Sequence, residues 1–241
     1  SSDEPIAISP KRETAPYDGL TPTTPAASAT IRVVDTSPNH PPAEATATVT
    51  FSDVQVLEPN VSSAWLIGSA QTIRWSQTGL QTVDLFYRVN SGPWQTITTG
   101  YDASLLSRAW SPPAAARSPQ VEVRIRDSID PSNGAADVSY VFKVYGALAL
   151  NPISGVSVGT PYSVIWTTTP VSSVPMVSLF LVDVTRGQTS SIASSIANTG
   201  AFPWTPTLAT AQAKLRVCDA DFPSTDANAC HESGIFPITG I

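Results

Sequence analysis

The sequence predicts an all-β protein built from tandem antiparallel β-sandwiches. The first observation is a repeat: a short apolar strand with an arginine ends in aspartate at Asp35, Asp127 and Asp219, which are 92 positions apart. The second is a succession of short alternating runs rich in Val, Ile, Thr and aromatics, separated by turn residues. The third is that no window shows a sustained 3.6-residue apolar period, so almost no helix is expected.

The repeat extends beyond the aspartate strand. Residues 65–75 match residues 156–166, which places Gly68 over Gly159 and Trp75 over Trp166. Each copy then ends in an apolar strand, and these three segments read TATVTF (46–51), VSYVFKV (138–144) and SGIFPI (233–238). About seven short strands in about 90 residues are typical of an Ig-like or fibronectin-III-like sandwich. We therefore expect one sandwich over residues 54–146 and a second over 147–241.

Residues 1–53 match only the C-terminal half of a repeat. The strand-ending tryptophan and its glycine have no counterpart in residues 1–16. Such a half-repeat would expose strand edges and an apolar face. Two explanations are open: the chain was taken from a longer array, or another chain supplies the missing strands by strand donation.

The composition restricts the partners. The net charge is −6 and the 13 Lys and Arg residues are scattered, so the basic stripe that nucleic-acid binding needs is missing. No run of about 18 apolar residues is present, so no membrane insertion is expected. We expect the partners to be other copies of the chain or neighbouring surface proteins, reached through the half-repeat, and cell-wall glycan as an additional candidate.

The repeat also resembles a known family, the Ig-like domain of the Ser-Thr-rich, GPI-anchored cell-wall proteins. The resemblance rests on residues 54–144, in these elements: Pro59, Trp65, Gly68, Thr72–Trp75, Val83–Tyr87, Trp94, Trp110–Pro113, Arg124–Asp127 and Phe142–Val144. The unit from 147 to 241 departs from it, because Val156 replaces the first tryptophan and none matches Trp94. The resemblance implies a modular spacer or adhesion domain without catalytic residues.

Cys218 and Cys230 lie at the end of one predicted strand and just before the next. Adjacent antiparallel strands bring such positions within disulfide range. Closing the loop between them would stabilise the fold by about 2–3 kcal/mol in the chain-entropy model, and it implies an oxidising compartment. The alternative is a metal site that uses both cysteines with Asp219 and His231, but no second pair of ligands completes it.

The aspartates after the repeated strands allow two interpretations. Asp127, Asp130, Asp219 and Asp221 could supply oxygen ligands to calcium. The simpler interpretation is that each strand-ending aspartate accepts hydrogen bonds from the N–H groups of its own turn. We favour the turns and expect no metal and no cofactor.

Three further residues are candidates for contact or modification. Trp94 and Trp65 are the tryptophans that we expect to be exposed and able to stack on a glycan, whereas burial explains the tryptophans that repeat. Asn60 begins an N-glycosylation sequon, Asn60-Val61-Ser62, in a predicted surface turn.

Catalysis has little support in the sequence. The two histidines, His40 and His231, lie in loops, and no hydrolase, metalloprotease or phosphate-binding motif occurs. We therefore expect a non-catalytic extracellular structural protein of a cell-surface, cell-wall or filament assembly. One alternative is an adhesion or carbohydrate-binding module, and a second is the spacer region of a larger secreted enzyme.

Overall fold

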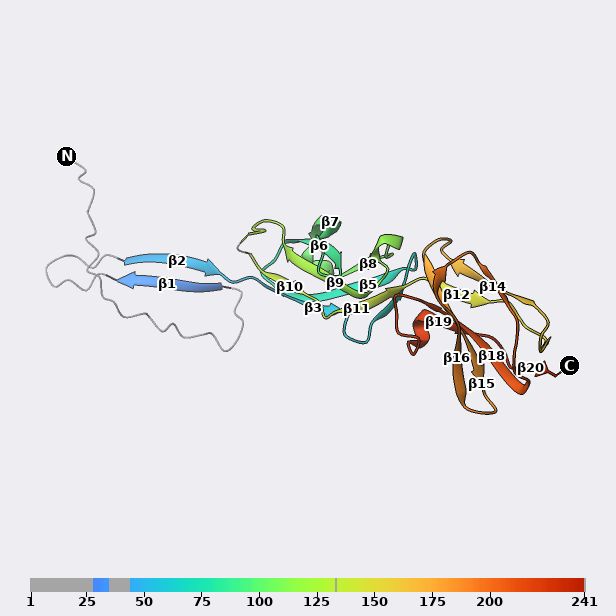
Figure 1. The fold of residues 1–241 in the computed structure, drawn as a ribbon. Coiled ribbons are helices and arrows are strands. Elements are labelled where there is room, and N and C mark those ends of the chain that lie inside the picture. Colours follow the sequence, from blue (N-terminus) through green and yellow to red (C-terminus); the bar gives the residue numbers. More distant parts are fainter. Residues whose placement is uncertain (1–27, 35–43, 133, 241) are drawn as a thin grey trace, which may run out of the picture. The chain divides into compact units, whose positions relative to one another are not determined.

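The computed structural model describes residues 28–34, 44–132 and 134–240 (Figure 1). Contacts divide the chain into two units, Ser1–Phe51 and Ser52–Ile241. The all-β prediction is confirmed: the described residues form strands and three short 3-10 turns, with no α-helix among them. Across those ranges no helix is long and apolar enough to cross a membrane.

The described part of the first unit is an antiparallel hairpin of β1 (Ser28–Val34) and β2 (Glu44–Thr50). In this hairpin Arg32 lies opposite Thr46. In the second unit Arg124 lies opposite Val138, and both residues are 92 positions further along the chain. The hairpin therefore has the register that a 92-residue repeat requires. The residues before it, which bear on the half-repeat prediction, lie outside the described ranges.

The second unit begins with one sandwich, the first sandwich. One sheet has the order β3-β5-β8 and the other has the order β4-β11-β9-β6-β7, with β10 paired to β9. The elements are β3 (Asp53–Glu58), β4 (Ala64–Leu66), β5 (Gln71–Thr78), β6 (Thr82–Val89), β7 (Gln95–Asp102), η1 (Ala103–Leu105), β8 (Ser107–Trp110), η2 (Ala114–Ala116), β9 (Ser118–Asp127), β10 (Ala136–Val138) and β11 (Phe142–Tyr145).

The second sandwich repeats this order strand for strand. Its sheets are β12-β14-β17 and β13-β20-β18-β15-β16, with β19 paired to β18. The elements are β12 (Ala147–Leu150), β13 (Val156–Ser157), β14 (Tyr162–Thr169), β15 (Met176–Asp183), β16 (Gln188–Ala197), β17 (Ala201–Trp204), β18 (Thr210–Asp219), η3 (Ala227–Ala229), β19 (Cys230–Glu232) and β20 (Phe236–Thr239).

Both sandwiches differ from the prediction in two respects. The first is that each contains a parallel strand pair, β4 with β11 and β13 with β20. The chain passes from β3 in one sheet to β4 at the edge of the other sheet, and it passes from β12 to β13 in the same way. At these edges β4 and β13 run in the same direction as the last strands, β11 and β20. The last strand is itself interrupted, because the Ser139 hydroxyl accepts the N–H of Val123 at 3.0 Å. Ser233 does the same for Leu215. The second is that splitting the first and last strands gives nine short strands per sandwich where about seven were expected.

Each sandwich has a separate hydrophobic core centred on a repeated tryptophan. Trp75 is 1% exposed and Trp166 is 2% exposed, which confirms that burial explains this repeated pair. Their indole nitrogens find different partners: Trp75 donates to the carbonyl of Ala103, and Trp166 donates to the side chain of Asn198. The repeated packing thus tolerates different local hydrogen bonding.

Candidate functional site: the joint between the two sandwiches

The two sandwiches meet at a joint within the second unit. The first sandwich contributes the residue before β9 and the end of β11, and the second contributes the loop between β18 and β19. We call these residues the joint: Arg117, Lys143, Tyr145 and Gly146 on the first side, and Asp219, Asp221, Phe222, Asp226 and Ala229 on the second, with Ser173 and Val174 against Gly146.

Strand alternation places the joint side chains of β11. Phe142 and Val144 are buried in the core of the first sandwich, so Lys143 and Tyr145 belong to the opposite face of the strand. Tyr145 is nevertheless only 1% exposed, because Phe222 and Ala229 of the second sandwich cover it. The Tyr145 and Phe222 ring centroids are 5.4 Å apart. This cluster of three is an apolar plug between the sandwiches.

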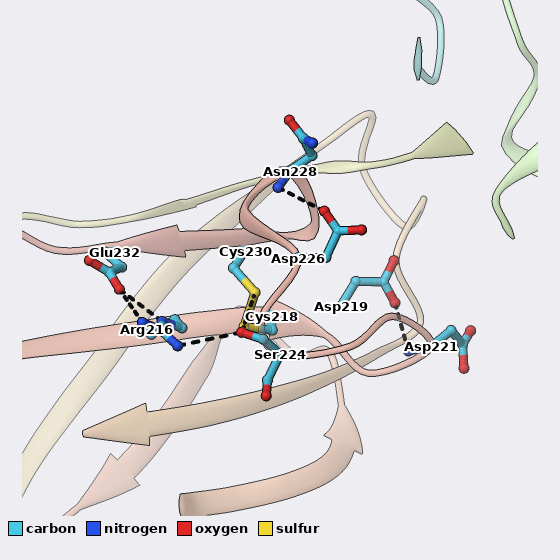
Figure 2. Close-up of a disulfide and its surroundings, with 9 residues drawn as sticks. All are labelled: Arg216, Cys218, Asp219, Asp221, Ser224, Asp226, Asn228, Cys230 and Glu232. Atoms are coloured by element: carbon cyan, nitrogen blue, oxygen red, sulfur yellow. Dashed lines mark hydrogen bonds and ion pairs between the residues drawn. A yellow bond between two sulfur atoms is a disulfide. The ribbon is translucent and has the colours of Figure 1, made fainter. Parts of the chain in front are cut away.

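The loop after β18 is shaped by its aspartates (Figure 2). The Asp219 carboxylate accepts the N–H of Asp221 at 3.2 Å, and the Asp226 carboxylate accepts the N–H of Asn228 at 3.1 Å, which caps η3. In the first sandwich the Asp127 carboxylate accepts the N–H of Ile129 at 2.8 Å. The turn interpretation of the strand-ending aspartates is therefore confirmed for Asp127 and Asp219.

A buried ion pair crosses the joint. Arg117 Nη1 lies 2.7 Å from Asp219 Oδ1 and 2.8 Å from Oδ2, and Nη2 contacts Asp221. The Asp219 side chain is fully buried and that of Arg117 is 12% exposed. Burial raises the pKa of Asp219 above its ordinary value even though Arg117 acts in the opposite direction. The Asp219 carboxylate is thus buried directly against the Arg117 guanidinium.

A second ion pair lies nearer the surface. Lys143 Nζ is 2.6 Å from Asp226 Oδ2, and the Lys143 side chain is 45% exposed. Burial of Asp226 acts to raise its pKa, but the hydrogen bonds from Lys143 and from the Asn228 N–H outweigh it, so the pKa of Asp226 is lowered. The pKa values of Asp219 and Asp226 are therefore shifted in opposite directions.

Beside the plug, two side chains of the second sandwich pack closely against the backbone of Gly146. A Cβ on Gly146 would lie 2.4 Å from the Ser173 hydroxyl and 2.6 Å from a methyl of Val174, and both neighbours are buried. Only glycine fits at this distance.

The Tyr145 hydroxyl has no hydrogen-bond partner within the described residues, and burial, with Asp226 nearby, raises its pKa to about 12.

The predicted disulfide is present between Cys218 and Cys230, which lie directly opposite each other on β18 and β19 (Figure 2). The alternative metal site is not formed, because both sulfurs are bonded to each other and Asp219 is held by Arg117. His231 Nδ1 accepts the N–H of Leu150 at 3.1 Å. Among the described residues no group of three or more His, Cys, Asp or Glu side chains is placed to hold a metal.

The calcium candidates lie in two different environments. Asp219 and Asp221 are occupied by the Arg117 guanidinium. Asp127 belongs to the first sandwich, where its carboxylate takes part in its own turn, and the Asp130 carbonyl accepts the N–H of Gly134. The structure thus explains three of the four carboxylates, Asp127, Asp219 and Asp221, by turns and ion pairs.

The glycan-contact prediction is wrong for Trp65. Its side chain is 7% exposed, because β4 alternates and directs Trp65 inward between exposed neighbours, against Phe142 at 4.8 Å and Trp110 at 6.0 Å. Trp94 is half-buried, with the Arg88 guanidinium 4.5 Å from its ring centre and that of Arg124 at 5.9 Å. A glycan role for Trp94 stays a prediction.

Asn60 lies in a surface turn, half-exposed. Its side-chain oxygen accepts from the Ser62 N–H at 2.9 Å and from the Ser62 hydroxyl at 2.7 Å, and its amide nitrogen donates to Glu58. The two polar residues of the sequon are thus in direct contact. Glycosylation at Asn60 stays a prediction.

Sequence reasoning missed the joint because it searched for positions that repeat. Val144 lies opposite Ser118, and Ile238 lies opposite Thr210, so the two sandwich ends can be aligned residue by residue. At the positions of Arg117, Lys143 and Tyr145 the second sandwich has small or uncharged residues, namely Ala209, Pro237 and Thr239. The available signal was this asymmetry between otherwise matching repeats.

Three comparisons with known proteins were made, and one of them gave a similarity. No family model matches the chain, and no curated protein matches it. Among solved structures it is similar to the tandem Ig repeats of Dlar, at 8% identity and a TM-score of 0.23, over 78% of this chain and 98% of that one. The strand order and registers described above carry the assignment to Ig-like sandwiches.

Proposed function

We propose that the protein is a non-catalytic structural protein of tandem Ig-like repeats at the cell surface, in which the joint holds adjacent repeats in a fixed orientation. The observation that carries this proposal is the joint itself. It combines an apolar plug, a fully buried carboxylate paired with Arg117, and a second ion pair. A flexible linker would need none of these contacts.

The energetics favour a single orientation. Separating the sandwiches would expose Tyr145 and Phe222 to water, and it would take Arg117 away from a carboxylate that the protein surrounds. Buried charge pairs are poor sources of net stability, but they tolerate few alternative geometries. The joint therefore acts mainly on orientation.

The extracellular setting of this proposal is supported by the disulfide, because such bonds persist in oxidising compartments. A place in a cell wall, as the family resemblance implies, belongs to the same proposal. The partners would be neighbouring copies or surface proteins, with wall glycan as a further one. The hairpin of β1 and β2 is the candidate contact, since the strand equivalent to β1 in the first sandwich, β9, also pairs with β6.

Residual dipolar couplings of the full, oxidised chain test the fixed orientation. If the joint is rigid, couplings from residues 53–145 and from 147–240 fit one alignment tensor. Replacement of the plug by Phe222→Ala should leave both cores folded and separate the tensors. Two tensors of different magnitude in the unmodified chain would contradict the proposal.

A further inference from the structure

We infer that the disulfide Cys218–Cys230 is a redox lock on the joint: its reduction releases the two sandwiches from their fixed orientation while each stays folded. The inference rests on the proposed function of the joint and adds a means of regulating it. It depends on where the disulfide lies relative to the joint, to the core and to solvent.

The disulfide encloses the second sandwich's loop in the joint. Asp219 follows Cys218 and Ala229 precedes Cys230, and the other three loop residues of the joint, Asp221, Phe222 and Asp226, lie between them in the sequence. Figure 2 shows the three aspartates beside the disulfide. The hydrogen bonds internal to this loop are short-range turns and a single 3-10 turn. Two further bonds hold it to the second sandwich, from the Ala220 N–H to the Met176 carbonyl at 3.0 Å and from Arg216 Nη1 to the Ser224 carbonyl at 3.4 Å. The disulfide is the covalent constraint on the segment that meets the first sandwich.

The disulfide lies outside the core of the second sandwich. That core is built around Trp166, Leu179 and Leu215, and neither cysteine belongs to it. Next to the disulfide, Arg216 of β18 is paired with Glu232 of β19. Loss of the covalent bond therefore leaves the strand pairing and the core in place.

The first sandwich shows that the fold does not require this bond. The residues equivalent to the cysteines are Arg126 and Ala136, which lie opposite each other on β9 and β10. The loop between them closes through the hydrogen bond from the Asp127 N–H to the Ala135 carbonyl, 2.8 Å long. The cysteines are an addition at a loop that takes part in the joint.

Cys230 is the more exposed of the two cysteines. A groove of about 520 Å³ is lined by Cys230 together with Ser224, Thr225 and His231, whereas Cys218 is 1% exposed. A thiolate of a dithiol reductant attacks Cys230 Sγ, forms a mixed disulfide and expels the Cys218 thiolate, which takes up a proton. The second thiol of the reductant then displaces Cys230, so that the protein gains two electrons and two protons and the reductant becomes a disulfide.

The loop contains an acceptor for the products. The Ser224 carbonyl oxygen lies 3.6 Å from Cys230 Sγ and 4.0 Å from Cys218 Sγ. Each thiol formed by reduction can donate to this oxygen. The two cysteine side chains are then no longer bonded to each other, and the segment carrying Phe222 and Asp226 gains freedom.

The test compares residual dipolar couplings of the full chain before and after treatment with dithiothreitol. The reference is the double variant Cys218→Ser/Cys230→Ser, with and without the same dithiol. We expect one alignment tensor in the oxidised chain, and tensors that differ in magnitude by a factor of about two or more in the reduced chain and in the variant. Chemical-shift dispersion should show both cores intact.

A monothiol such as glutathione should form its mixed disulfide at Cys230, as located by mass spectrometry of the peptides. The inference is overturned if the reduced chain and the double variant keep one tensor, if the second sandwich unfolds on reduction, or if the adduct forms at Cys218. Two tensors already present in the oxidised chain would instead overturn the proposed function of the joint.

Discussion

The two sandwiches have the same strand order and the same registers, but their equivalent ends differ. The first sandwich presents Arg117 just before β9, and Lys143 and Tyr145 on β11. The second sandwich has Ala209, Pro237 and Thr239 at the corresponding positions. Only the first end is covered by another sandwich within the described residues. The two sandwiches thus have similar ends, and the side chains of Arg117, Lys143 and Tyr145 allow one of these ends to contact the neighbouring sandwich.

The two hairpin loops differ in the same way. The loop after β9 closes without a covalent bond, and the loop after β18 is closed by the disulfide and carries Phe222 and three aspartates. Residues that differ between repeats thus determine their contacts, and residues that repeat maintain their cores. Four predictions test this comparison.

Removal of Arg117 should have the largest effect. Arg117→Ala leaves the fully buried Asp219 without its cation, and breaking a buried pair in this way costs about 3–5 kcal/mol of unfolding free energy. Urea denaturation of the full chain measures it. The matched control is Arg186→Ala, which removes a more exposed partner of Asp183 and should cost about 0–1 kcal/mol. Equal losses in the two variants would contradict the comparison.

The glycines that follow the two equivalent strands should respond differently. Gly146→Ala places a methyl against buried Ser173 and Val174 and should cost about 1–3 kcal/mol, as overpacking does. Gly240→Ala, at the matching position of the second sandwich, meets nothing within 4 Å and should change stability by less than about 0.5 kcal/mol. Thermal denaturation distinguishes the two, and a similar melting temperature for both would refute a tight joint.

Asp219 and Asp226 should titrate on opposite sides of the ordinary aspartate pKa of 3.8. Because the pKa of Asp219 is raised, its ionised form disfavours the folded state above that pKa, and this unfavourable contribution decreases as the pH falls from the raised pKa towards the ordinary value of 3.8, below which it is absent. Asp226 has a lowered pKa, so its stabilising contribution is present above 3.8 and is lost only at lower pH. Carboxyl carbon shifts should give a midpoint above 3.8 for Asp219 and below it for Asp226.

The Arg117→Ala variant provides a check on that titration. Since Arg117 lowers the pKa of Asp219, its removal should move the Asp219 midpoint to still higher pH. An unchanged midpoint would mean that the pair does not form in solution.

The smallest change is expected for Tyr145→Phe. The hydroxyl of Tyr145 is buried and has no partner among the residues that the structure describes, so its removal should alter the unfolding free energy by no more than about 0.5 kcal/mol, or stabilise the protein slightly. Urea denaturation measures this change. A loss of more than about 1 kcal/mol would reveal a partner for the hydroxyl, such as an internal water.

The sequence predicted the features that depend on local pattern. Strand alternation and the period of 92 residues identified the cores around Trp75 and Trp166, and the strand-ending aspartates were correctly placed in turns. The cysteine spacing identified the disulfide. Trp65 was misplaced because an aromatic near the start of a repeat gives no sign of which sheet its strand joins, and β4 crosses to the other sheet.

The sequence by itself determined the all-β class, the repeat and the covalent link between Cys218 and Cys230, because these follow from residue type and spacing along the chain. Only the tertiary structure decided that Arg117 meets Asp219 and that Tyr145 meets Phe222. These pairs are 102 and 77 positions apart and belong to different sandwiches, so no local pattern relates them. These residues meet because the end of the first sandwich packs against the loop between β18 and β19 of the second sandwich.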